Sequence, residues 1–133
     1  MDARSTEEPA GNPTILFAGQ ISGVEGYTES IATGMLAGMY AAALVRGAQP
    51  EPVPRATALG SLVHYITHAD EKSFQPANIT FDLLPALEEE LRKKTRDKKE
   101  RHRVQCERAL EALGLWLDAR PEPLPAGSAF LQV

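Results

Sequence analysis

A turn built from glycine constrains this chain more than any other feature of its sequence. Gly19, Gly23 and Gly26 follow a short apolar run over residues 14–18, and a pattern rich in Gly, Ala and Met comes next. An apolar run that ends at glycine is typical of a short buried strand. Glycine lets a ligand or another backbone approach closely, because it carries no side chain. The sequence therefore predicts a strand, a loop and a helix that begins near Tyr27.

This helix is expected over residues 28–46. Apolar residues occur almost all round it, so we expect it to be buried. Gly34, Gly38 and Ala42 recur every four residues and form a smooth stripe along one side. Each interior glycine costs about 1 kcal/mol relative to alanine. This cost predicts that another backbone packs against the stripe.

The rest of the chain predicts more helix than strand. Residues 48–55 form a Pro-rich connector, and apolar spacing predicts a second helix over 57–69. Residues 70–82 are expected to be irregular, and a single third helix is expected over 85–117. The predicted fold class is mainly α with one or two short strands.

Composition divides the chain into four parts. Residues 1–13 are polar and acidic and are expected to form a disordered lead-in. Residues 14–54 hold the strand, loop and first helix. Residues 55–117 form a helical C-terminal region with a basic helix, and residues 118–133 are a Pro-rich tail.

Positive charge is concentrated in the third predicted helix. The formal net charge is −4, which excludes a general attraction to nucleic acid. However, nine of the 14 Lys and Arg residues lie within residues 92–108, against three acidic residues. Such a segment can bind RNA phosphates, and the candidates are Lys93, Lys94, Lys98, Lys99 and Arg101. The alternative is a solvated helical face whose acids pair with cations one turn away. No aromatic residue lies within residues 92–108, so base stacking is not expected there.

Other features exclude classes of function. Cys106 is the only cysteine, which excludes an internal disulfide and fits a reducing cytosol. No apolar run reaches the roughly 18 residues of a membrane span, so we predict a cytoplasmic protein with no membrane partner. His64 and His68 have the spacing of a metal pair, but no third ligand lies nearby and no metal is predicted.

The stretch AGQISGVEGYTES, residues 18–30, resembles the second FAD-contacting motif of the glucose-inhibited-division-type flavoproteins, which modify tRNA. This family has two similar branches: the MnmG-type enzymes, which act on the wobble uridine, and the TrmFO-type tRNA uracil-5-methyltransferases. Val24, Glu25 and Ser30 agree with the second branch. Further stretches that resemble it are residues 54–67, 74–87 and 98–113.

The resemblance implies a particular fold and cofactor site. The chain would be a C-terminal fragment of an α/β FAD-binding domain of the glutathione-reductase-like Rossmann type, followed by a helical cap. Catalytic residues would lie in a missing N-terminal part, because no G-x-G-x-x-G loop is present. Backbone amides around residues 23–27 and the positive end of the first helix would face the flavin. The residues implied along the flavin are Gly19, Gln20, Gly23, Val24, Glu25, Gly26 and Tyr27.

The resemblance also implies a reaction, which is the formation of 5-methyluridine in the tRNA T-loop. The cofactor would be FAD, with 5,10-methylenetetrahydrofolate and NAD(P)H as substrates. The partners would be tRNA and the remainder of the FAD domain, and the chain alone is expected to be inactive. Two alternatives stay open: an MnmG-like modification of the wobble uridine, and a non-catalytic helical binding module left after loss of the FAD domain.

Overall fold

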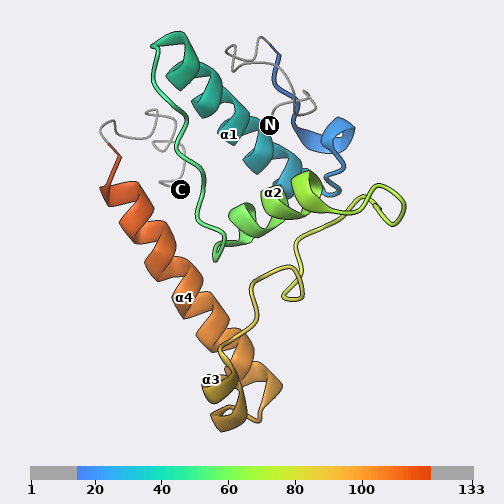
Figure 1. Cartoon of the computed structure of the whole chain (residues 1–133), viewed down its shortest axis with the longest axis vertical. Helices are drawn as coiled ribbons and strands as arrows, with labels where there is room; N and C mark the ends of the chain where they lie inside the picture. The colour runs from blue at the N-terminus through green and yellow to red at the C-terminus, as the bar shows by residue number, and fades with distance from the viewer. Residues whose placement is uncertain (1–14, 121–133) are drawn as a thin grey trace, which may run out of the picture.

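The computed structural model describes residues 15–120, and this part of the chain is mainly helical, as predicted. The expected lead-in and nearly all of the Pro-rich tail lie outside the described residues. Figure 1 shows the order of the elements: the 3₁₀ helix η1 (Gly19–Ser22), then α1 (Tyr27–Val45), α2 (Ala58–His68), α3 (Glu89–Lys94) and α4 (Lys98–Asp118). The helix α2 crosses the N-terminal half of α1, while α4 begins beside α3 and its C-terminal end lies near the connector that joins α1 to α2.

The strand expected over residues 14–18 does not form in its described part, residues 15–18. Pairing within the described residues is limited to isolated bridges, one of which joins Val24 to Ala77 in parallel. Glu25 N–H donates to the Ala77 carbonyl at 2.9 Å, and Ala77 N–H donates to the Gly23 carbonyl at 3.1 Å. A strand needs a neighbouring strand along its length. Within residues 15–18 only Leu16 takes part in an isolated bridge, so this run pairs at one point and forms no strand.

The core lies where α1 and α2 meet the glycine turn. Val24 from the turn, Leu36 from α1 and Leu62 from α2 are almost completely buried. Helix α1 contacts both η1 and α2. The turn is therefore held by packing from two helices as well as by hydrogen bonds.

Helix α1 is buried on one face only, so the expectation of a buried helix holds for that face and not for the other. Tyr27 is 91% exposed, Ile31 73% and Val45 88%. A Cβ added at Gly34 or Gly38 would meet nothing within 4 Å. We call the exposed side of α1 its outer face, which carries Tyr27, Ile31, Gly34, Met35, Gly38 and Val45. This apolar outer face is exposed because nothing in residues 15–120 packs against it.

The single helix expected over residues 85–117 is two helices. Helix α3 ends at Lys94, and the backbone leaves the helical region at Thr95, with φ −106° and ψ 86°. Helix α4 then begins after Asp97, whose Oδ2 accepts a hydrogen bond from Glu100 N–H at 3.2 Å. An aspartate that accepts from an amide three residues later is a typical N-cap. This cap stabilises a new helix start inside the charged segment.

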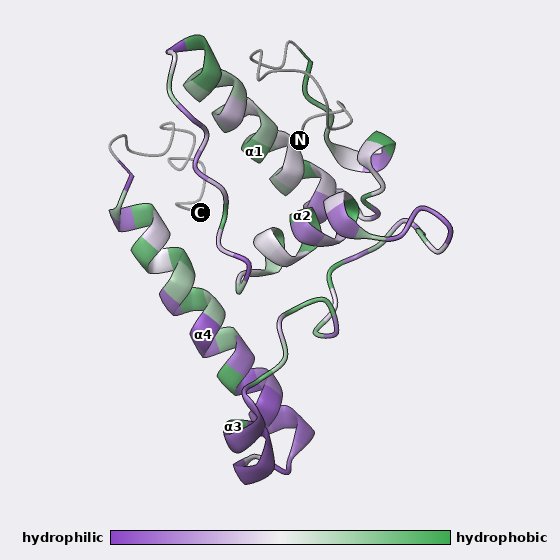
Figure 2. Cartoon of the chain, in the orientation of Figure 1, coloured by the Kyte–Doolittle hydropathy of each residue, from purple (hydrophilic) through white to green (hydrophobic). Residues whose placement is uncertain are grey.

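Hydropathy differs between the two ends of the molecule. Figure 2 shows hydrophilic residues gathered on α3 and on the adjoining half of α4, whereas α1 is largely hydrophobic. Within residues 15–120, no helix combines the length and the hydropathy that crossing a bilayer requires.

The N-cap of α2 gives a first prediction. Thr57 is 4% exposed. Its hydroxyl accepts from Gly60 N–H at 3.0 Å and donates to the Pro54 carbonyl at 2.7 Å. Thr57→Ala removes both hydrogen bonds and should lower the free energy of unfolding by about 1–2 kcal/mol, measured by urea denaturation. Thr57→Ser keeps the hydroxyl and should retain most of the stability. Equal urea midpoints for the alanine variant and the parent would contradict this role.

Candidate functional site

The glycine turn is shaped by residues from a distant part of the same chain. Gly19, Gly23 and Gly26 all have positive φ, between 72° and 88°. A Cβ added at Gly23 would lie 2.1 Å from Cζ of Phe74, and one added at Gly26 would lie 2.8 Å from Oδ1 of Asn78. Gly23 is therefore needed on the inner side of the turn by the Phe74 ring, whereas Gly26 is needed for its backbone conformation, with φ 86° and ψ 146°, whether or not a ligand lies outside.

Most amides of the turn are already paired within the chain. Gly23 N–H donates to the Gln20 carbonyl at 3.0 Å, Val24 N–H to Gly19 at 3.4 Å, and Glu25 N–H to Ala77 at 2.9 Å. The expectation that all amides around residues 23–27 face a ligand is therefore wrong for the first three. The turn closes on itself because the 3₁₀ helix and the Ala77 bridge use these donors.

The tip of α1 keeps the donors that can still meet a ligand. The amides of Gly26, Tyr27 and Thr28 have no acceptor among residues 15–120. These are the first amides of a helix, which point along its axis at its positive end. The Glu29 carboxylate lies beside Gly26 and accepts from Ile79 N–H at 3.3 Å, so it faces the 77–79 segment. An anionic or electron-rich group could therefore approach only from the other, exposed side, where Tyr27 lies.

The seven residues implied for the flavin site separate into two groups. Val24 is completely buried and contributes to the core, and Gly23 is buried beneath Phe74. In contrast, Gln20, Glu25, Gly26 and Tyr27 are exposed on the outside of the turn. Gly19 lies between the groups, since its N–H donates to the Thr33 hydroxyl. The exposed residues and the tip of α1 form the surface against which a flat cofactor could lie.

Thr33 joins the turn to α1. Its hydroxyl accepts from Gly19 N–H at 3.1 Å and donates to the Glu29 carbonyl at 2.9 Å. The side chain is completely buried, so water cannot replace either partner. This role could not be predicted from the sequence, because a threonine inside an apolar helix gives no sign of a partner outside the helix.

Thr33→Val tests this connection. Valine keeps the shape but leaves Gly19 N–H without an acceptor, which should cost about 1–3 kcal/mol of stability. Amide hydrogen exchange at Gly19 should become faster, as measured by NMR. Thr28→Val is the matched control, because Thr28 is exposed on the same helix, and it should change stability by less than about 0.5 kcal/mol. If both variants had the same effect, Thr33 would not anchor the turn.

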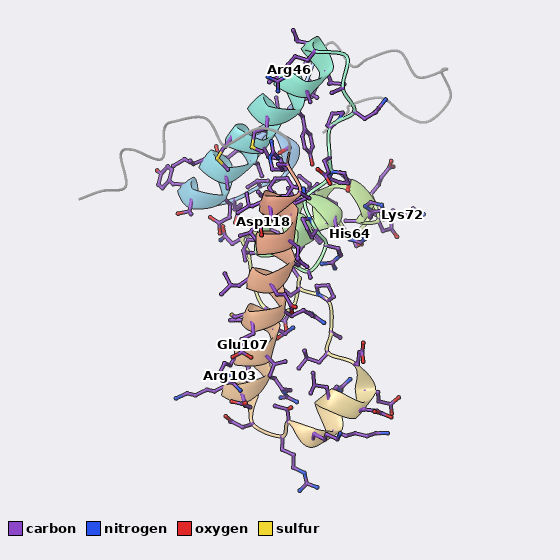
Figure 3. The ribbon with its side chains drawn as sticks, turned by 90° about the vertical axis from the view of Figure 1, so that its left-hand side faces the viewer. Arg46, His64, Lys72, Arg103, Glu107 and Asp118 are labelled. Carbon is purple, nitrogen blue, oxygen red and sulfur yellow. The ribbon has the colours of Figure 1, made fainter. Side chains whose placement is uncertain are left out.

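Some of the basic residues form ion pairs with acidic residues, and others do not. Lys93 forms an ion pair with Glu89 at 2.8 Å. Arg103 pairs with both Glu100 and Glu107, and its hydrogen bond holds the pKa of the Glu100 carboxyl below its usual value. Figure 3 shows Arg103 and Glu107 next to each other on α4. The alternative of a compensated helical face therefore describes Lys93 and Arg103.

The other predicted RNA contacts have no acidic partner in the described part of the chain. These are Lys94, Lys98, Lys99 and Arg101. Two of them, Lys98 and Arg101, line a cavity of about 290 Å³ between α4 and the 81–87 segment. Arg92, Phe81 and His102 also line this cavity, and none of these three was predicted. No sequence pattern indicates Phe81, because it lies in a loop outside the basic segment.

The two histidines at metal-pair spacing interact with each other instead. The rings of His64 and His68 stack with centroids 4.2 Å apart. His68 Nδ1 lies 2.8 Å from the Thr67 hydroxyl. No group of three metal-ligating side chains occurs within residues 15–120.

Comparison with protein families gives one match near the glycine turn. Residues 4–49 match the family model described as glucose inhibited division protein A. This range contains η1, the turn and all of α1.

Curated relatives extend the similarity across most of the chain. The chain is 63% identical over 106 residues to the methylenetetrahydrofolate–tRNA-(uracil-5-)-methyltransferase TrmFO of Koribacter versatilis, covering 80% of this chain and 24% of the relative. Proteins of the same name from Solibacter usitatus and Symbiobacterium thermophilum are 68% and 51% identical over 102 and 111 residues. These two matches cover 76% and 84% of this chain, and 23% and 24% of the relatives. The chain thus spans about a quarter of the length of the relatives that it matches.

Proposed function

This chain is a relative of the TrmFO branch of the glucose-inhibited-division-type proteins, and on that basis we propose that it supplies part of a tRNA uracil-5-methyltransferase. Its role in such an enzyme is to complete the FAD site and to contribute surface for tRNA. The proposed reaction forms 5-methyluridine in the T-loop. The names of the relatives favour this reaction over the MnmG-like modification of the wobble uridine.

The observation that carries the proposal is the unpaired tip of α1. The amides of Gly26, Tyr27 and Thr28 are open to one exposed side, and Tyr27 offers a flat ring there. Oriented amides stabilise negative charge without reorganisation. FAD supplies redox chemistry when bound, and these residues fit its electron-rich ring edge. Gln20 and Glu25 are exposed beside the same turn and would border the ring.

The remaining parts of the site would come from outside this chain. We propose that the rest of the FAD domain packs on the outer face of α1, which is apolar and uncovered in residues 15–120. The catalytic residues, and the groups that bind 5,10-methylenetetrahydrofolate and NAD(P)H, would belong to that part. A cytoplasmic location fits a tRNA substrate and a single cysteine.

Reconstitution tests the proposal. The chain is co-expressed with the Solibacter usitatus relative from which the matching segment has been removed. The purified complex should retain flavin, seen by visible absorbance, and should form 5-methyluridine in unmodified tRNA, measured by mass spectrometry. The truncated relative with its own segment restored is the positive control. If that control is active and the complex with this chain neither binds flavin nor modifies tRNA, the proposal fails and a non-catalytic module is favoured.

A tRNA substrate variant separates the two uridine targets. Replacing the T-loop target uridine with cytidine should abolish product formation in the reconstituted complex. A product that instead required the wobble uridine would support the MnmG-like alternative.

A further inference from the structure

The cavity between α4 and the 81–87 segment is lined by cations from two helices, α3 and α4. Arg92 comes from α3, and Lys98 and Arg101 come from the first turns of α4. The cavity holds about 290 Å³, and Asp82 is the one acidic residue in its lining. This volume is near the lower end of ligand pockets, which span roughly 300–1,000 Å³. The cavity is thus a small site with a positive lining.

The carboxylates of α3 and α4 that form ion pairs are engaged by other cations. Glu89 is engaged by Lys93, and Glu100 and Glu107 are engaged by Arg103. No ion pair joins Arg92, Lys98 or Arg101 to an acidic group of residues 15–120. The break between α3 and α4 therefore turns three cations toward one cavity and leaves their charge available.

An aromatic pair forms one wall of the same cavity. The rings of Phe81 and His102 stack with centroids 3.8 Å apart and planes 1° from parallel. Phe81 is 39% exposed, so this wall is not sealed inside the protein. Nucleobases stack on such flat surfaces, whereas a phosphate or a carboxylate gains nothing from them.

We propose that this cavity binds one nucleotide of single-stranded RNA. The base stacks against the Phe81–His102 pair, and the adjoining phosphates contact Arg92, Lys98 and Arg101. The inference rests on the proposed function for the presence of RNA, and it adds a base-contacting site to the basic segment. An acidic peptide would use the cations without the rings, so the aromatic wall favours a nucleotide.

Two fluorescent probes separate stacking from charge. One is a short oligouridylate, and the other is an abasic oligomer with the same number of phosphates. Binding to the purified chain is followed by fluorescence anisotropy at several salt concentrations. One stacked base should make the oligouridylate bind about 5–100-fold more tightly. Phe81→Ala should remove this difference and leave binding of the abasic oligomer unchanged.

Charge variants test the phosphate contacts. Lys98→Gln should weaken binding of both probes and reduce the slope of log affinity against log salt by about one. Lys72→Gln is the control, because Lys72 is an exposed lysine outside the basic segment that does not line the cavity, and it should change affinity less than twofold.

Several outcomes would overturn the inference. These are equal affinities for the two probes, an unaltered preference in Phe81→Ala, equal effects of Lys98→Gln and Lys72→Gln, and no binding of either probe. Phe81→Trp keeps a flat ring and should keep the preference, so that a folding defect is not mistaken for lost stacking. The proposed function is judged separately, since flavin retention and 5-methyluridine formation by the reconstituted complex do not enter this binding assay.

Discussion

Gly60→Ala is expected to lower the free energy of unfolding by about 1–3 kcal/mol, the range typical of overpacking. The loss would occur although alanine is the better helix former by about 1 kcal/mol. A Cβ at Gly60 would lie 2.0 Å from the Pro54 carbonyl oxygen and 2.6 Å from its carbon. Both are backbone atoms, so the connector must move away from α2. This movement would also disturb the Thr57 cap, because Thr57 bonds both Pro54 and Gly60.

The same substitution at Gly34 provides the control. Gly34 lies inside α1, and an added Cβ there meets nothing within 4 Å. Gly34→Ala should therefore raise the stability of this chain by about 0.5–1 kcal/mol. Urea denaturation of both variants measures the two changes. If Gly60→Ala were as stable as Gly34→Ala, the close contact between α2 and the connector would not exist in solution.

Local signals in the sequence were sufficient to predict the positions of the first two helices. The prediction of a helix over 57–69 is confirmed by α2 at Ala58–His68, because apolar spacing and the Thr57 cap agree. The prediction over 28–46 is confirmed by α1 at Tyr27–Val45. The break before α4 was missed, although Asp97 followed by Glu100 is a recognisable cap pattern. The charged residues on both sides favour helix, so one continuous helix was predicted across the cap.

Long-range contacts could not be predicted in the same way. The turn was found from its glycines, but the Phe74 ring that requires Gly23 comes from a distant loop. The direction of the turn amides depends on the Ala77 bridge, which no local pattern indicates. Likewise, the stacking of Phe81 on His102 brings a loop residue to a helix. The sequence could locate the candidate site, whereas its inner and outer sides were set by tertiary structure.

Gly34→Leu should reduce assembly with the rest of the FAD domain without destabilising this chain. The outer face of α1 is open here, so a leucine side chain costs the isolated chain no packing. If another backbone approaches Gly34 in the assembled protein, the added side chain must push it away, at a cost of about 1–3 kcal/mol. A loss of 1.4 kcal/mol corresponds to about tenfold in affinity. We therefore expect association and flavin retention in the reconstituted complex to fall by about 10–100-fold.

Gly114→Leu is the matched control for this experiment. Gly114 lies in α4 and an added Cβ there also meets nothing within 4 Å, but it is not on the outer face of α1. It should leave association and flavin retention within about twofold of the parent, because surface substitutions usually change stability by less than about 0.5 kcal/mol. Association is measured by co-purification and bound flavin by absorbance. Normal assembly of Gly34→Leu would show that the glycines of α1 do not serve close packing. The apolar outer face would then require a different explanation, because a partner that tolerates a leucine at Gly34 cannot place its backbone against this stripe.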